Sequence, residues 1–152
     1  MKYKLTMMTL VLFCAISQLT TVAQEKQSLS YGPGAELEGR LIVQRKYGPP
    51  NFGENPKTDT RLKIPIVVLT RAINVRGIPG DPFQSASVDG VRRVQLVFTA
   101  PSMDYKALVG KDIRVKGALW HATTGGHYTD VVIFVDSVEA IKRGRATAVA
   151  GP

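Results

Sequence analysis

The stretch LWHATTGGHYTD, residues 119–130, carries both histidines of the chain and its single tryptophan. If the five residues between His121 and His127 form a hairpin loop, the two imidazoles lie opposite each other, with Cβ atoms roughly 4.5–5.5 Å apart. Such a pair could share a zinc or copper ion, but a stable site usually needs a third ligand. By strand alternation Asp130 lies on the opposite face from His127. Thr129 lies on the same face as His127, but its hydroxyl is a poor ligand for these metals. A metal site therefore stays an alternative without a complete ligand set.

Two other interpretations of the histidines are open. Protonation of two facing rings would make a pH-sensitive pair near their ordinary pKa of about 6.5. Alternatively, the role is structural: one imidazole forms a hydrogen bond with the backbone or with Thr129 and holds the loop in place. A catalytic role would need a nucleophile and an orienting carboxylate. The chain has no nucleophile elbow, Walker loop or metalloprotease motif, and Glu54, Asp59 and Asp89 form no recognisable set. We therefore expect no catalytic residues, no cofactor and no enzymatic activity.

The first 23 residues are typical of a cleavable secretory signal. Two lysines precede the apolar stretch LTMMTLVLFCAISQL, and TVA is an acceptable cleavage site before Gln24. A membrane anchor is the alternative. We expect a periplasmic or secreted protein with no transmembrane span after cleavage. The single cysteine, Cys14, leaves with the signal, so the mature chain has neither a disulfide nor a thiolate.

The chain is basic, with 20 Lys and Arg against 12 Asp and Glu. An exported basic protein favours anionic partners, although the charge could also serve solubility alone. An anionic polymer could lie over the outward-facing basic residues of the strands, for which the alternative is a solvated exterior. These residues are Arg40, Lys63, Arg93, Arg114 and Lys116. Export and the lack of an RNP-like aromatic cluster argue against nucleic acid. We expect a monomer.

Period-two alternation of apolar residues predicts five strands, over residues 36–46, 61–74, 91–99, 111–121 and 130–138. The last contains VVIFV and should be covered on both faces. The stretch PSMDYKALVG, residues 101–110, indicates a short helix with Ser102 as its N-cap and Gly110 in the left-handed position. Gly, Pro and Asn predict a long loop over Tyr47–Thr60.

Five strands with a helix between the third and fourth are the order of the OB-fold, a small, partly open Greek-key barrel. A β-sandwich is the alternative that the patterning allows. We expect a signal peptide (1–23), a flexible lead (24–35), an all-β, five-stranded OB-like barrel (36–139) and a disordered basic tail (140–152).

OB-folds bind ligands over strands two and three and between the loops joining strands one–two and four–five. Here these loops are Tyr47–Thr60 and Ala122–Thr129. They predict the ligand-binding residues Tyr47, Phe52, Trp120, His121, His127 and Tyr128. The leading hypothesis is a non-enzymatic module that binds an envelope glycan, peptide or protein. The alternative is a small metal-binding or metal-sensing protein that uses His121 and His127.

Two motifs resemble the bacterial domain of unknown function 4431. The first is GPPNFGE, residues 48–54. The second falls on Gly110, Lys111, Gly117, Leu119, His121, Ala122, Thr124, Gly125, His127 and Thr129. Gly126 stands where the family more often has the first of two paired histidines, and Tyr128 lies between His127 and Thr129, which weakens any proposal that needs a histidine cluster. The resemblance implies export and an OB-like barrel over about residues 39–135, and no established activity.

Overall fold

The computed structural model describes residues 27–99 and 104–142. These residues form one sheet and a single 3-10 turn, η1 (Lys106–Leu108). The strands are β1 (Ser28–Ser30), β2 (Gly32–Tyr47), β3 (Arg61–Arg76), β4 (Val88–Phe98), β5 (Asp112–His121) and β6 (Val131–Ala140). The all-β class is therefore confirmed. The expected signal peptide, the proposed N-cap Ser102 and residues 143–152 of the expected tail lie outside the described residues.

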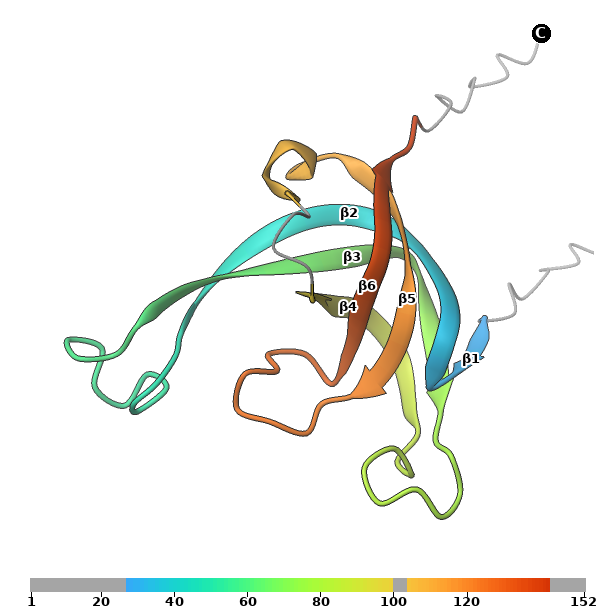
Figure 1. Cartoon of the computed structure of the whole chain (residues 1–152), viewed down its shortest axis with the longest axis horizontal. Coiled ribbons are helices and arrows are strands. Elements are labelled where there is room, and N and C mark those ends of the chain that lie inside the picture. Colours follow the sequence, from blue (N-terminus) through green and yellow to red (C-terminus); the bar gives the residue numbers. More distant parts are fainter. Residues whose placement is uncertain (1–26, 100–103, 143–152) are drawn as a thin grey trace, which may run out of the picture.

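Each of the five long strands pairs with two other long strands. The sheet order is β1-β3-β2-β5-β6-β4, and β3 also pairs with β4 (Figure 1). The β4–β6 pair is parallel, and the other pairs of long strands are antiparallel. The expected number of strands, five, was wrong, because the short strand β1 adds a sixth beside residues 74–76 of β3.

The expected flexible lead, residues 24–35, is instead ordered wherever the structure describes it. Residues 28–30 form β1, and β2 begins at Gly32. Tyr31 and Ala35 are buried in the main apolar cluster, so this segment contributes to the core. Between them Gly32 and Gly34 have φ of 114° and 84°, values that L-residues with a side chain rarely adopt. They lie where the register of β2 against β5 shifts.

Alternate residues of the long strands build the core, as period-two patterning predicts. Leu37 and Leu41 of β2 pack with Val115 and Leu119 of β5. The apolar run in β6 is covered on both faces, as expected, because Val131, Val132 and Ile133 are all fully buried. Burial of this much aliphatic surface stabilises the sheet. Within the described residues no helix is long and apolar enough to cross a membrane.

The expected helix over residues 101–110 is reduced to η1 in the part that the structure describes. The carboxylate of Asp104 accepts a hydrogen bond from the N–H of Lys106, at 2.9 Å. Gly110 then has φ of 80°, the left-handed conformation expected for it. Its N–H donates to the carbonyl of Leu41, and this bond returns the chain to the sheet at once.

Strands β2 and β3 extend beyond the other strands as a two-stranded arm (Figure 1). Residues 43–47 of β2 and 61–65 of β3 pair only with each other in the registers of the sheet. The arm consists of these two segments together with the loop 48–60 between them. It places that loop beside the loop 122–130, which joins β5 to β6 (Figure 1).

Candidate functional site

A buried carboxylate fixes the loop of the arm. Asp59 is 7% exposed, and its side chain accepts hydrogen bonds from the N–H groups of Asn51 (2.9 Å) and Gly53 (2.7 Å). The side-chain amide of Asn51 adds a third bond. Burial alone would raise the pKa of Asp59, but these hydrogen bonds outweigh it and hold the pKa below its ordinary value. The loop is therefore held from inside by one ionised side chain.

Phe52 lies between the two amides that Asp59 holds. Its φ is 51°, in the left-handed region that bulky residues rarely enter. Its N–H donates to the carbonyl of Gly48, so three successive N–H groups of the loop have fixed partners. The ring is nevertheless 50% exposed. The loop thus holds a large apolar side chain in a strained backbone conformation at the surface.

A buried amide fixes the loop between β5 and β6. Gln95 of β4 is 7% exposed, and its side chain donates to the carbonyl of Gly126 (3.1 Å) and accepts from the N–H of Tyr128 (2.7 Å). The N–H of Gln95 donates to the hydroxyl of Thr129, at 2.9 Å. Period-two alternation along β4 predicts that the side chain of Gln95 points to solvent, and this prediction is wrong. The face on which it lies is covered by the loop that it holds.

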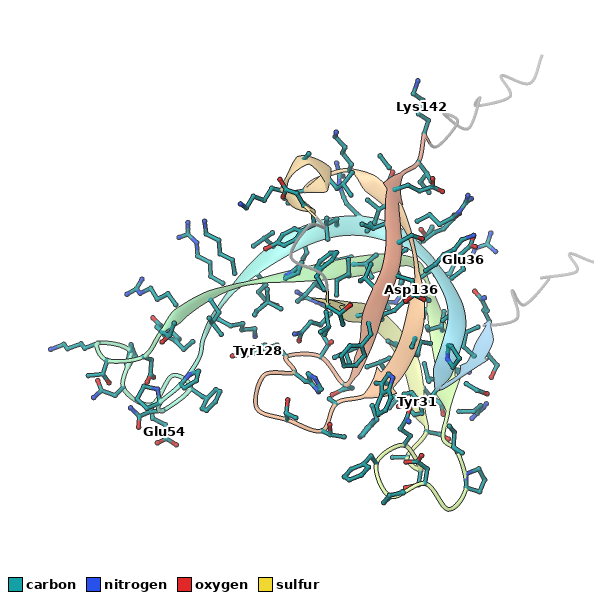
Figure 2. The ribbon with its side chains drawn as sticks, viewed as in Figure 1. Tyr31, Glu36, Glu54, Tyr128, Asp136 and Lys142 are labelled. Atoms are coloured by element: carbon teal, nitrogen blue, oxygen red, sulfur yellow. The ribbon has the colours of Figure 1, made fainter. Side chains whose placement is uncertain are left out.

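The two loops contact each other. The hydroxyl of Tyr128 donates to the backbone carbonyl of Tyr47, 3.0 Å away. Figure 2 shows Tyr128 on the side of its loop that faces the arm. A Cβ atom placed on Gly125 would lie 3.3 Å from Cζ of Phe52, so the absence of a side chain at this glycine admits the ring. Three expected site residues, Tyr47, Phe52 and Tyr128, are therefore brought together.

The two histidines do not face each other across the hairpin, contrary to our expectation. His121 pairs with Val131, and the N–H of Ala122 donates to the carbonyl of Asp130. The loop therefore has nine residues rather than five, and it contains His127. Nδ1 of His121 lies 3.0 Å from the hydroxyl of Tyr31, and the two rings meet edge to face. Burial first, and the charge of Asp130 second, raise the pKa of Tyr31, which keeps its hydroxyl protonated.

His127 has a structural partner inside its own loop. Its Nδ1 accepts a hydrogen bond from the N–H of Thr123, at 3.1 Å, and its own N–H donates to the carbonyl of Thr124. Burial lowers the pKa of His127, which favours the neutral ring that this bond requires. No group of three or more potential metal ligands occurs among residues 27–99 and 104–142. The third ligand that the metal alternative lacks in the sequence is therefore not supplied by these residues.

Trp120 ends a row of paired residues on the face opposite the core. The row crosses β3, β4, β6 and β5 and consists of Ile66, Gln95, Val132 and Trp120. Ile66 and Val132 are fully buried, whereas Trp120 is 38% exposed and meets Phe134 edge to face. Trp120, an expected binding residue, is therefore partly accessible, and Phe134 contacts one side of its indole ring.

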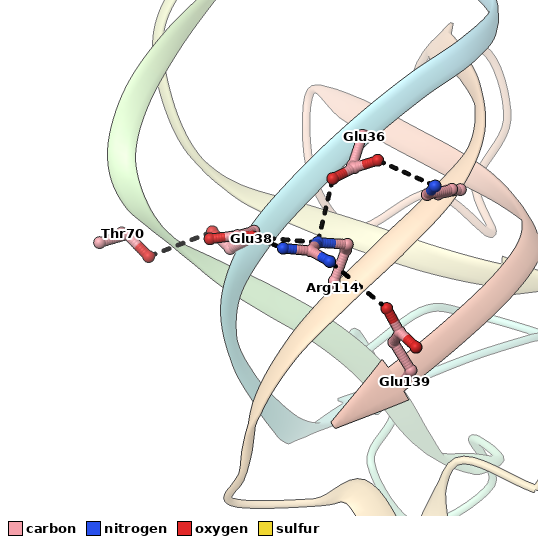
Figure 3. A network of polar contacts seen from close by, with 6 residues as sticks. Glu36, Glu38, Thr70, Arg114 and Glu139 are labelled. Atoms are coloured by element: carbon pink, nitrogen blue, oxygen red, sulfur yellow. Dashed lines mark hydrogen bonds and ion pairs between the residues drawn. The ribbon is translucent and has the colours of Figure 1, made fainter. Parts of the chain in front are cut away.

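The basic exterior is less open to ligands than we expected. Arg114 contacts three carboxylates, at 2.7 Å from Glu38, 3.0 Å from Glu36 and 3.6 Å from Glu139 (Figure 3). Hydrogen bonding to Glu38, and then the charge of that carboxylate, raise the pKa of Arg114. Lys116 also pairs with Glu36, at 3.1 Å. These two cations are neutralised within the sheet.

Two further cations of the expected set bind neutral oxygens. Arg40 donates to the carbonyl of Gly110, at 2.9 Å, and Arg93 donates to the side-chain carbonyl of Gln44, also at 2.9 Å. Their charge is not cancelled by these contacts. Lys63, the fifth member of the set, has none of these partners and lies on the arm.

A surface recess of about 410 Å³ lies beside the joined loops. Its lining includes Tyr128 and Thr129 from the β5–β6 loop, Gln44 and Lys46 from β2, and Arg93 from β4. Asp89 and Asp130 also line it, so both signs of charge are present. The recess places directed polar groups next to Tyr128 of the β5–β6 loop.

The part of the chain from β4 to β6 resembles a known family. Residues 93–139 match the family model of DUF4431, a domain of unknown function. The expected resemblance is confirmed for these residues. The match includes the second of the two motifs, whereas the first, in the loop of the arm, precedes it. No curated protein and no solved structure matches the chain.

Asp59 and Gln95, which hold the two loops in place, are not among the binding residues that the sequence predicts. In the sequence, Asp59 is one of three unconnected loop carboxylates, and the alternation along β4 would place Gln95 in solvent. One sequence signal could have indicated Asp59. It is an aspartate in the same turn-rich loop as Asn51 and Gly53, and aspartate side chains commonly accept hydrogen bonds from nearby backbone N–H groups. The role of Gln95 depends on contacts 31 and 33 residues away, so local sequence carries no signal for it.

Proposed function

We propose that the protein is a non-enzymatic, exported binding module with an OB-like barrel. Its ligand-binding surface consists of the loop of the arm, the β5–β6 loop and the recess beside them. The ligand is a component of the cell envelope, namely a glycan, peptide or protein. Phe52 and Trp120 supply apolar and stacking area, and Tyr128 and the recess supply directed polar contacts.

Three features of the fold support a barrel of the OB type. The pairing of β3 with β4 joins strands that are otherwise far apart in the sheet order. Each long strand then has two neighbours, which is the condition for closing a sheet without free edges. A one-turn 3-10 helix lies between β4 and β5, at the place of the helix in an OB-fold. In that fold, ligands bind between the two loops that contact each other here.

The observation that carries the proposal is the strained, half-exposed Phe52. A bulky residue with positive φ costs of order 1–3 kcal/mol and persists only when its surroundings determine it. Here Asp59 and Gly48 fix the backbone on both sides of the residue. Because Phe52 is half exposed, this strained conformation adds little to the packing of the core. A rigid aromatic side chain at the surface can, however, bind a partner with little loss of side-chain entropy.

Binding of an envelope partner tests this proposal. The purified protein, its Phe52→Ala variant and its Phe83→Ala variant are immobilised and exposed to detergent extracts of the envelope and to purified envelope glycan. Phe83 is the matched control, because it is an exposed aromatic (63%) on the loop between β3 and β4. We expect a partner that is retained by the wild type and by Phe83→Ala, and weakened about tenfold or more by Phe52→Ala.

Equal retention of every partner by the wild type and Phe52→Ala would refute the binding surface. A Trp120→Ala variant tests the second aromatic in the same assay. Export is tested separately, by mass spectrometry of the protein recovered from its native location, where we expect a chain that begins at Gln24.

A further inference from the structure

The arm carries a second, differently charged recess on its other side. Residues Val43, Arg45, Lys63, Tyr105, Lys106 and Val109 line this recess, which has a volume of about 360 Å³. Three of the six are cations, and none is acidic. Tyr105 stacks on Phe98 with a ring distance of 5.1 Å, so one wall has a fixed position. The recess joins the arm to the segment around η1.

Two of the cations face each other directly. Arg45 of β2 and Lys63 of β3 are cross-strand partners, and both are exposed. Directly opposed residues on one face have Cβ atoms about 4.5–5.5 Å apart, and like charges in such pairs are destabilising. The nearest carboxylate in sequence to the third cation, Lys106, is that of Asp104, and it accepts the backbone N–H of Lys106. No ion pair involves Arg45, Lys63 or Lys106 among the described residues.

The cations of this recess differ from those on β5, which have carboxylate partners. On β5, Arg114 and Lys116 share three glutamates that β2 and β6 supply. At the recess, the sequence instead places like charges opposite each other and leaves them without a carboxylate. A bound anion would remove the repulsion and supply the missing acceptors.

We infer that this recess is a binding site for a phosphate group. Arg45 donates in a planar fork that matches two oxygens of a tetrahedral oxyanion, and Lys63 and Lys106 supply compact charges beside it. Val43, Tyr105 and Val109 provide an apolar wall for the organic part of a phosphate ester. The site is formed by residues different from those of the proposed ligand-binding loops and goes beyond that function.

The test uses the purified protein in phosphate-free buffer at constant ionic strength. Inorganic pyrophosphate is the soluble probe, followed by amide NMR shifts. Vesicles of phosphatidylcholine with and without phosphatidylglycerol are the membrane probe, followed by cosedimentation. We expect saturable shifts centred on Arg45, Lys63 and Lys106 with pyrophosphate, or binding that requires phosphatidylglycerol. The first outcome identifies a soluble phosphate ester and the second a lipid headgroup, and either supports the site.

Matched variants separate a site from general charge. The double variant Lys63→Gln/Lys106→Gln should weaken binding of whichever probe responds by about tenfold, whereas Lys116→Gln should leave it unchanged. Lys63→Gln alone should not lower the melting temperature, because it removes a like-charge contact. Absence of saturable binding to both probes, or an equal loss in Lys116→Gln, would overturn the inference. Phe52→Ala should retain phosphate binding, which distinguishes failure of this site from failure of the loop surface.

Discussion

The hydroxyl of Tyr128 and the backbone carbonyl of Tyr47 are joined by a hydrogen bond of 3.0 Å. The two residues are 81 positions apart: Tyr128 lies in the β5–β6 loop, and Tyr47 ends β2 next to the loop of the arm. The bond joins the β5–β6 loop to the residue that precedes the loop of the arm. It is the direct polar link through which one loop can fix the position of the other.

Removing this link should loosen both loops. Tyr128→Phe deletes the donor and keeps the ring, so we expect a loss of about 0.5–1.5 kcal/mol in the free energy of unfolding in urea. Tyr105→Phe is the control, because the hydroxyl of Tyr105 makes no hydrogen bond within the described part of the chain. Identical stabilities for the two variants would show that the bond between the loops is not formed in solution.

Gln95 should matter more to stability than an outward-facing glutamine. Gln95→Met preserves the length of the side chain and removes the partners of Gly126 O and Tyr128 N. Leaving such groups unpaired costs about 1–3 kcal/mol. Urea denaturation measures this loss, and hydrogen exchange of the Tyr128 amide should accelerate. The exposed Gln27, changed to Met, should have little effect on either quantity, and a similar loss in both variants would argue against a specific role of Gln95.

Much of the fold follows from local pattern, because one buried face imposes period two on a strand. Alternation predicts that Leu37 and Leu41 face inward, and the continuous VVIFV run predicts a strand covered on both faces. The structure confirms both. The long loop after Tyr47 followed from its Gly, Pro and Asn content. The resemblance to DUF4431 was likewise evident from the second motif.

The expectations that failed depended on contacts between distant segments. Alternation places Gln95 outward on its own strand, but it cannot show that a loop 30 residues later folds over that face. The shortest loop between the histidines predicts that they face each other, whereas the bond from the N–H of Ala122 to the carbonyl of Asp130 closes a longer loop. The polar, Gly-rich neighbours of Tyr31 predict a flexible lead, and local pattern gives no sign that this one aromatic is buried.

The loop of the arm should lose its order in acid. The pKa of Asp59 is lowered in the folded state, so the stability that its carboxylate contributes is present above its ordinary pKa and is lost as pH falls through the folded value. Asp59→Asn places an amide donor where two N–H groups now donate, and it should lower the melting temperature at neutral pH. Asp136→Asn, at an exposed position, is the control. A melting temperature that is equally unaffected in both variants would contradict the role of Asp59.

The β5–β6 loop should also respond to pH, but in a higher range. His127 accepts the Thr123 N–H through Nδ1, and protonation of that atom would replace the acceptor with a donor. Its pKa is lowered in the folded protein, so the unfolded chain binds more protons between the folded value and the ordinary value of about 6.5. Stability should therefore be constant with respect to this group above about pH 6.5 and should decrease as the pH falls below that value.

NMR titration of the His127 imidazole should give a pKa under the ordinary value, and the amide of Thr123 should shift with the same midpoint. His127→Gln should remove the part of the pH dependence of the urea midpoint that this titration accounts for. A normal titration of His127, uncoupled from the Thr123 amide, would show that the bond does not exist in solution.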